Sequence, residues 1–384
     1  MSGPLEGMVV VDATNFVFGP VATMLLGDMG ADVIKVEPPE GDPTRGIGRS
    51  RSKGMGSFFL NINRNKRSVV LDLKTGEGRE ELQRLLAGAD VFVHNMRSTA
   101  LGRLGLGYEQ LREVFPRLVH ASALGFGDGG EYFDQPAYDD VIQSLSGMAA
   151  INARAFGSPQ YVPMLLTDKL CGIYLAQGIT AALLHRERTG RAQKVEVPML
   201  ETMAAFNLLE HMADGVLAPE AGEEEAWEGY ARVFSPSHRP LRTKDGHLGL
   251  VANTDAQWTR LFALLGRPEL MQDERFKTIG KRMQHIRELY GIVEEVLLQR
   301  PTGEWMRLLR EQDLPAACVN DINGLKTDPH LQQARFFRHF KHPSEGDLVM
   351  CDVTTRFSDS PASIRRGPPG LGEHNAELLA PAGK

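Results

Sequence analysis

The stretch MVVVDATNFVFGPVATMLLGDMGADVIKVE, residues 8–37, decides the fold. Met8–Asp12 is a short β-branched run of the kind that parallel sheets bury on both faces. A loop leads to a helix over Val21–Met29, Gly30 ends that helix, and Ala31–Glu37 forms the next strand. This order of strand, loop, helix and strand is typical of the opening unit of a dinucleotide-binding fold.

The loop of this unit lacks the glycines with which such folds hold a pyrophosphate. Residues 15–20 read NFVFGP, with no GxGxxG and with a proline in the first helical turn. The pattern therefore predicts a Rossmann-like fold and argues against an NAD-dependent oxidoreductase.

Strands and helices continue to alternate as far as residue 124. We expect strands at 68–73, 91–95 and 118–124, separated by helices at 76–88 and 108–115. Such spacing predicts right-handed crossovers and a parallel sheet covered on both sides. Ligands of these sheets bind at the carboxyl ends of the strands. The candidate site therefore comprises the segments that follow strands, residues 15–18, 38–45, 95–97 and 125–130.

A basic segment lies between the second and third predicted strands. Its cations have only Asp72 as a counter-charge within the segment; they are Arg45, Arg49, Arg51, Lys53, Arg64, Lys66, Arg67 and Lys74. Such a field favours binding of a polyanionic small molecule. The same pattern also fits a solvated basic loop.

A long helix begins near Asp168 and is stopped by Thr189-Gly190. Thr167 or Asp168 is expected at the N-cap. We expect the Asp168 carboxylate to ionise easily, because unpaired N–H groups at a helix start favour negative charge. Taken alone, this aspartate fits a helix cap, and a catalytic role needs support from elsewhere in the chain.

The second half of the chain has a different pattern. An acidic run, APEAGEEEAWE, occupies residues 218–228, and beyond it one strand is expected at 247–253 with helices at 255–265, 282–298 and 302–311. These patterns predict four parts: a large domain over 1–217, a linker over 218–229, a small α+β domain over 230–335, and a C-terminal segment over 336–384 that returns to the large domain.

Composition limits the partners and the compartment. A net charge of −6 over 384 residues argues against binding to nucleic acid or anionic membranes. The eleven histidines and three cysteines show no metal-ligand spacing, so no metal is expected. With no signal-peptide pattern and no long apolar run, we expect a cytoplasmic protein.

Taken together, the motifs resemble one family. The stretches 19–37, 63–74, 91–111, 167–201, 243–252, 266–276 and 369–375 are similar, in the same order, to the class III CoA-transferases. The resemblance implies an interlocked homodimer of two ring-like chains, each with a Rossmann-like large domain and a smaller α+β domain. It also implies an active site between domains of both subunits. The substrates would be an acyl-CoA and a small carboxylic acid, with no permanently bound cofactor.

The resemblance also assigns residues. Asp168 falls on the catalytic aspartate of the family, which forms an aspartyl anhydride and then an aspartyl-CoA thioester. The coenzyme A contacts that it implies are Val17, Phe18, Lys74, Asn95, Met96, Arg97, Arg103 and Tyr138. Formyl-CoA transferases carry glutamine at the position of Val17, which argues against formate or oxalate here. From residue type alone, we expect Arg232, His238 and Arg239 to pair with a carboxylate of a larger dicarboxylic acid.

Two alternatives stay open at this stage. The first is a racemase of the α-methylacyl-CoA type, a branch of the same fold that places a His-Asp pair where this chain has Tyr138-Asp139. Tyrosine is a poor base at neutral pH, so CoA transfer is favoured over racemisation. The second is a protein that binds coenzyme A without turnover.

Overall fold

The computed structural model describes residues 3–217, 229–230 and 232–379. The chain divides into two compact units, which are described separately. The first comprises Met1–Ala149, Tyr161–Asn207 and His330–Lys384, and the second comprises Ala150–Gln160 and Leu208–Pro329. The predicted linker falls mostly on residues 218–228, which lie outside the described residues.

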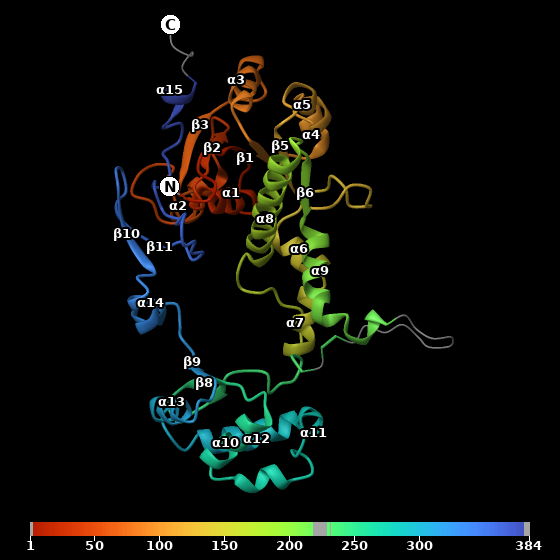
Figure 1. The fold of residues 1–384 in the computed structure, drawn as a ribbon, viewed down its shortest axis with the longest axis vertical. Helices are drawn as coiled ribbons and strands as arrows, with labels where there is room; N and C mark the ends of the chain where they lie inside the picture. The colour runs from red at the N-terminus through yellow and green to blue at the C-terminus, as the bar shows by residue number, and fades with distance from the viewer. Residues whose placement is uncertain (1–2, 218–228, 231, 380–384) are drawn as a thin grey trace. The chain divides into compact units, whose positions relative to one another are not determined.

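The first unit is built on a six-stranded sheet in the order β3-β2-β1-β4-β5-β6, and every neighbouring pair is parallel (Figure 1). Its strands are β1 (Val9–Ala13), β2 (Asp32–Glu37), β3 (Lys66–Val70), β4 (Val91–His94), β5 (Val119–Leu124) and β6 (Lys194–Pro198). The predicted α/β class with a parallel sheet is confirmed. The chain order reverses between β1 and β4, and this reversal opens a crevice at the carboxyl ends of those two strands.

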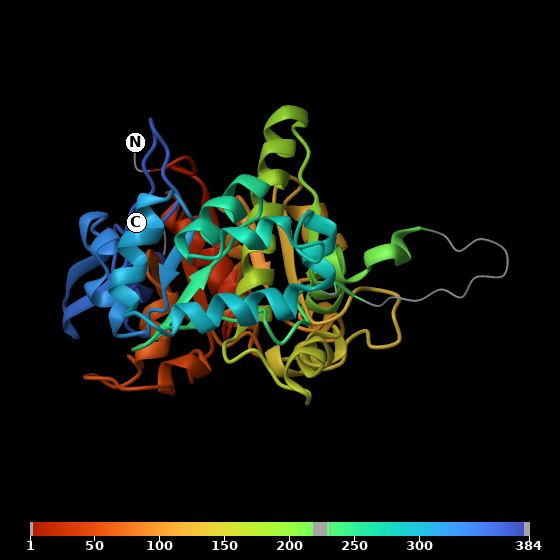
Figure 2. The ribbon, with the colours of Figure 1, turned by 90° about the horizontal axis from the view of Figure 1, so that it is seen from below.

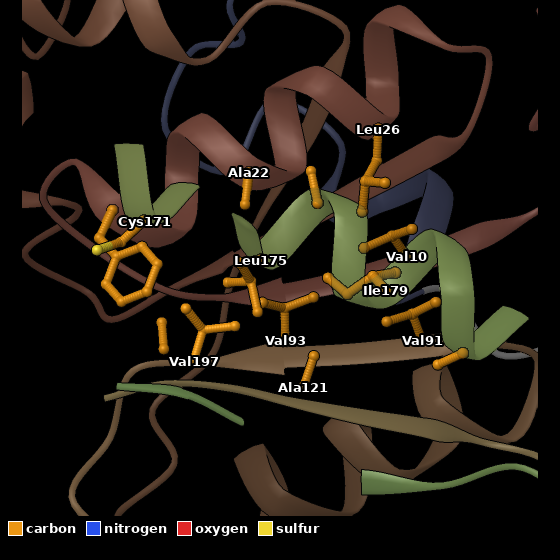
Figure 3. Close-up of a cluster of buried hydrophobic side chains, with 14 of the residues drawn as sticks. Val10, Ala22, Leu26, Val91, Val93, Ala121, Cys171, Leu175, Ile179 and Val197 are labelled. Atoms are coloured by element: carbon orange, nitrogen blue, oxygen red, sulfur yellow. The ribbon is translucent and has the colours of Figure 1, made fainter. Parts of the chain in front are cut away.

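One face of this sheet is covered by α1 (Phe18–Asp28) and α8 (Leu166–Thr189). Figure 3 shows Leu175 and Ile179 of α8 reaching toward Val93 and Ala121 of the strands. Small residues allow this close packing, because a Cβ atom added at Gly172 would lie 3.0 Å from the carbonyl oxygen of Phe18. The helix that carries Asp168 is therefore fixed against the first helix of the fold.

The opposite face carries a second apolar cluster. Leu82 and Leu86 of α3 (Gly76–Ala87) pack with Phe92 of β4, beside α4 (Ser98–Arg103) and α5 (Tyr108–Val114). The sheet is thus buried on both faces, as its β-branched strands predict.

Further helices complete the first unit. They are α2 (Ser57–Ile62), α6 (Asp139–Leu145), the start of α7 (Met148–Phe156), most of α9 (Met199–His211) and the 3-10 turn η1 (Pro43–Gly46). Residues from 330 onward add the end of α14 (Pro329–Gln333), the hairpin β10 (Phe337–His342) with β11 (Gly346–Cys351), and α15 (Asn375–Leu378). They contact the sheet directly, since the His374 N–H donates to the Ser68 carbonyl at 3.0 Å.

In its described residues, the second unit has a small antiparallel sheet and helices that pack around one apolar core (Figure 1, Figure 2). Its elements are β7 (Leu241–Arg242), β8 (His247–Leu250), β9 (Ala316–Cys318), α10 (Asp255–Leu264), α11 (Ile279–Gln284), α12 (Ile286–Leu297), α13 (Thr302–Glu311), and the 3-10 turns η2 (Ala213–Val216), η3 (Pro268–Gln272) and η4 (Gly324–Thr327). Trp258, Phe262 and Trp305 fill the core.

One predicted helix differs from the observed structure. The helix predicted over 282–298 is two helices, because the backbone leaves helical geometry at His285 between α11 and α12.

Four of the eight cations of the basic segment do not contribute to an open positive field. They are paired with carboxylates from other parts of the sequence: Arg45 with Glu37, Arg64 with Asp28, Lys66 with Asp12, and Arg67 with both Asp32 and Glu377. Both readings of the segment, as a polyanion-binding field and as a solvated loop, are therefore wrong for these four side chains. A count of charges within the segment does not include these partners, because the fold brings them in from β1, α1, β2 and α15.

Candidate active site

A cavity of about 620 Å³ lies in the first unit, where β1, β4 and β5 end. Its walls include the segments that follow these strands, Asn15–Phe18, Asn95–Arg97 and Gly125–Phe126. Tyr138 and Asp168 also line it. Apolar and aromatic walls with a few polar groups are typical of small-molecule sites.

Two asparagines join the loops on the two sides of the crevice. The Asn95 amide nitrogen donates to the carbonyl and to the side-chain oxygen of Asn15, each at 3.0 Å. In return, the Asn15 N–H donates to the Asn95 side-chain oxygen at 3.3 Å. These bonds fix the loop after β1 against the loop after β4.

The loop after β1 is held in an unusual backbone conformation. Phe16 has φ of 62°, in the left-handed region that non-glycine residues seldom adopt. Its ring meets the ring of Tyr138 edge-on, with the centroids 5.5 Å apart. Tyr138 is 57% exposed at the cavity wall, so it is no core residue.

Asp168 lies in the first turn of α8, two residues after the helix begins at Leu166. The N-cap position is Leu165, so the prediction that Thr167 or Asp168 caps the helix is wrong. The physical reason is Asp139, whose Oδ2 accepts from the Thr167 hydroxyl at 2.7 Å and from the Asp168 N–H at 3.1 Å. A carboxylate from α6 thus satisfies the helix start, and the Asp168 carboxylate is left for the cavity.

Burial, and secondly the charge of Asp139, raise the pKa of Asp168 to about 7. The expectation that this carboxylate ionises easily is therefore wrong. Desolvation opposes its charge, and Asp139 takes the N–H group that would otherwise stabilise it. Asp139 is 3% exposed and also accepts from the Gln143 amide at 2.6 Å.

Most of the predicted site residues meet at this cavity. Those that line it are Val17, Phe18, Asn95, Met96, Arg97, Tyr138 and Asp168. Lys74 and Arg103 are not among its lining residues: Lys74 precedes α3, and Arg103 ends α4.

The residues predicted to bind the acid, Arg232, His238 and Arg239, belong to the second unit. There, Arg239 forms two hydrogen bonds with the Glu294 carboxylate, at 2.8 and 2.9 Å. The Arg239 guanidinium is thus already paired within its own unit.

Sequence reasoning missed Asp139 as a member of the site. It stands 29 residues before Asp168, and only the fold brings the two carboxyl groups together. The available signal was its place directly after Tyr138, where the racemase alternative requires a paired aspartate. Phe16 and Phe126 of the cavity wall lie within the predicted segments 15–18 and 125–130, but neither was singled out, because single aromatic residues in loops carry no pattern.

The described residues offer neither a metal site nor a membrane-spanning helix. No group of three or more histidine, cysteine, aspartate or glutamate side chains is placed to hold a metal ion. Within the same described ranges, no helix is both long and apolar enough to cross a membrane.

Comparison with known proteins agrees with this geometry. The model of CoA-transferase family III matches residues 5–375. Human succinyl-CoA:glutarate CoA-transferase is 31% identical over 98% of this chain and 85% of its own length. Formyl-CoA:oxalate CoA-transferase of Streptomyces avermitilis is 33% identical over 98% of this chain and 95% of its own.

Among solved structures, Rv3272 of Mycobacterium tuberculosis superposes with a TM-score of 0.85 at 31% identity, over 99% of both chains. A CAIB/BAIF family protein of Brucella suis gives a TM-score of 0.82, also at 31% identity and over 99% of both chains. The chain therefore belongs to CoA-transferase family III and is an enzyme of the CoA-transferase class.

Proposed function

We propose that this enzyme moves coenzyme A from an acyl-CoA to a free carboxylic acid, with Asp168 as the nucleophile. The observation that carries the proposal is the place of the Asp168 carboxylate. It lines the cavity at the strand ends, while Asp139 rather than Asp168 satisfies the start of α8.

In the first half-reaction, an Asp168 carboxylate oxygen attacks the carbonyl carbon of the thioester. The carbon–sulfur bond breaks, coenzyme A leaves as a thiolate, and a mixed aspartyl anhydride remains. The thiolate then attacks the aspartyl carbonyl of the anhydride. The donor acid leaves as a carboxylate, and an aspartyl-CoA thioester is formed.

The second half-reaction reverses these steps with the acceptor. The acceptor carboxylate attacks the aspartyl carbonyl and releases the thiolate, and the thiolate attacks the acyl carbonyl of the new anhydride. The products are the new acyl-CoA and a free Asp168 carboxylate. One thioester replaces another, so the exchange consumes no ATP and leaves no net proton.

Each tetrahedral intermediate carries an oxyanion that needs hydrogen-bond donors. The start of α1 at Phe18 lies on the cavity wall, and the first N–H groups of a helix have no partner within the helix. Backbone N–H groups at Val17 and Phe18 are thus suited to this role. Arg97, also on the wall, is suited to the phosphates of coenzyme A.

The acid substrates are proposed by class. Relatives named for succinate and glutarate make small dicarboxylic acids the first class to test. Arg232, His238 and Arg239 remain the proposed partners of a second carboxylate, and Arg239 would have to leave Glu294 to serve.

We also propose a homodimer, interlocked as the family resemblance implies. Apolar side chains on α8 support it, since Ile173 and Leu184 are each 53% exposed beside a cavity of about 710 Å³. A partner chain would cover them. Light scattering should give twice the 42.3 kDa of one chain; a monomer at catalytic concentrations contradicts the dimer.

A donor–acceptor screen tests the activity. Succinyl-CoA and acetyl-CoA are each incubated with a panel of free acids, and the new thioesters are identified by mass spectrometry. We expect exchange with the wild type and none with Asp168→Ala. Asp128→Asn is a matched control, because Asp128 is exposed and does not line the cavity. Deuterium uptake at C2 of a 2-methylacyl-CoA in D₂O, without exchange, would instead indicate racemisation.

A further inference from the structure

Beneath the loop after β1 lies a group of charged side chains that the proposed chemistry does not use. Asp12, Lys35 and Lys66 are each 0% exposed. They come from three neighbouring strands, β1, β2 and β3, and their functional groups meet below the loop and helix start that line the cavity.

The Asp12 carboxylate is fully used as an acceptor. Its Oδ1 accepts from the N–H of Thr14 at 3.0 Å and also from the Thr14 hydroxyl. Its Oδ2 accepts from the Thr23 hydroxyl at 2.6 Å and from the Lys66 ammonium at 3.0 Å. Asp12 therefore holds both the first residue of the loop and the first helix after it.

The two lysines hold the two ends of the loop through its carbonyl groups. Lys35 Nζ donates to the Thr14 carbonyl at 2.9 Å and pairs with Asp42 at 2.9 Å. Lys66 Nζ donates to the Pro20 carbonyl at 2.9 Å and to the Asn63 side chain at 3.0 Å. The segment from Thr14 to Pro20 is thus fixed at both ends from below.

The Thr14–Pro20 segment contains both a strained residue and the residues proposed to contact the substrate. Phe16, with φ of 62°, lies between the two anchored ends. Such conformations persist only where the surrounding structure over-determines them. Gly19 permits the tight approach, because a Cβ atom there would lie 2.4 Å from the Thr14 side chain.

A gain in stability does not by itself explain why three charged side chains are buried here. Replacement of buried ion pairs by apolar residues of similar volume is often neutral or stabilising. A positional role accounts for the donors aimed at main-chain carbonyls, which an apolar core could not supply.

We propose that the buried Asp12–Lys35–Lys66 group positions the Thr14–Pro20 segment, including the strained Phe16. Held in this geometry, the segment presents the backbone of Val17 and Phe18 to the reacting thioester. The buried group replaces the glycine-rich loop that this chain lacks at the same place in the fold. The expected effect on kcat rests on the proposed function, whereas the expected effect on the conformation of the Thr14–Pro20 segment does not.

The test compares Lys66→Met with Arg186→Met. Arg186 is also buried and pairs with Asp90 at 2.9 Å. It lies at the far end of α8 from Asp168 and lines neither the cavity of Asp168 nor the one beside Ile173 and Leu184. We expect Lys66→Met to lower kcat by about tenfold or more, with a smaller change in KM for the acyl-CoA, because small misplacements of reacting groups are costly. We expect Arg186→Met to keep kcat within about twofold, as misplacement there does not reach the reacting groups.

Hydrogen exchange of the peptide that spans Thr14–Pro20 is the second readout, and it needs no turnover. Faster exchange in this peptide for Lys66→Met, and not for Arg186→Met, is the expected result. Unchanged kcat or unchanged exchange in a folded Lys66→Met protein would overturn the proposal. If the wild type transfers no coenzyme A, the proposed function fails, while the exchange measurement still decides the positioning role.

Should Lys66→Met not fold, Thr23→Val serves in its place. It keeps the volume and removes one hydrogen bond to Asp12. A kcat lowered severalfold, together with faster exchange in the same peptide, supports the proposal. Wild-type values for both would refute it.

Discussion

The Asp139 carboxylate accepts a hydrogen bond from the backbone N–H of Asp168 at 3.1 Å. Because of this hydrogen bond, the two carboxylates at the start of α8 have different roles. Asp139 satisfies the backbone, and Asp168 presents a less solvated, more basic carboxylate to the cavity. A nucleophile of raised pKa is stronger once ionised, but it must first lose its proton.

The rate of exchange should rise with pH. Asp168 has a pKa raised to about 7 by burial and by Asp139, so the reactive carboxylate form increases between about pH 6 and 8. The check is single-turnover formation of the covalent intermediate across this range. A rate already at its plateau at pH 5 contradicts the assignment.

Asp139→Asn should shift this pH dependence. Removal of the neighbouring charge lowers the pKa of Asp168, so the rising limb of the pH–rate profile should move to lower pH. Asparagine offers one acceptor oxygen where Asp139 uses two, so we also expect a loss of stability of about 1–3 kcal/mol. Asp128→Asn is the matched control, because Asp128 is exposed and does not line the cavity. An identical shift in both variants would show that Asp139 has no special effect.

The stability of the protein should depend on pH through the same group. The pKa of Asp168 is raised from its ordinary value of 3.8 to about 7, so between these values the folded state binds more protons than the unfolded state. Stability from this group is therefore lost as the pH rises through that window. Asp168→Asn removes the cost of burying an ionised carboxylate. This variant should therefore be more stable than the wild type by about 1–3 kcal/mol at pH 8.

Denaturant unfolding at pH 4 and at pH 8 measures this difference. The advantage of Asp168→Asn should be largest at pH 8 and should disappear toward pH 4. An advantage that is equal at both pH values would mean that the Asp168 carboxyl is not destabilised by burial.

The ion pair between Arg45 and Glu37 makes a separate prediction. Both side chains are buried, and the guanidinium lies 2.7 Å from the carboxylate. Arg45→Met leaves the Glu37 carboxylate buried without its partner, so we expect a loss of about 3–5 kcal/mol in the free energy of unfolding.

The control for this prediction is Arg307→Met, which removes a pair between the exposed side chains of Arg307 and Glu311. That change should cost less than about 1 kcal/mol. The double variant Arg45→Met/Glu37→Gln should recover part of the larger loss. Equal costs for the two single variants would contradict the role of burial.

The sheet could be predicted from sequence because its strands carry their own signal. Runs such as residues 9–11 are β-branched and buried on both faces, and helices of suitable length separate them. The start of β3 was placed too late, at 68 rather than at Lys66. Lys66 and Arg67 look like surface residues in the sequence. Their carboxylate partners, Asp12 for Lys66 and Asp32 with Glu377 for Arg67, are distant in sequence and explain why the two side chains are largely removed from solvent.

The candidate site could be predicted only in part for the same reason. Residues 15–18 and 95–97 follow strands, and this place in the fold brings them together without further information. The Asp139–Asp168 contact and the Asp12–Lys35–Lys66 group depend on side chains distant in sequence. Local patterns carry no record of such contacts, so the N-cap and the ionisation of Asp168 were both predicted wrongly.

Chemical trapping of the covalent intermediate tests the central claim most directly. The wild-type enzyme is incubated with an acyl-CoA donor and no acceptor, quenched with hydroxylamine, and mapped by peptide mass spectrometry. We predict a hydroxamate on Asp168, absent without the donor and absent from Asp168→Asn. Exchange that proceeds with Asp168 unmodified, or with the label on another residue, would contradict the account.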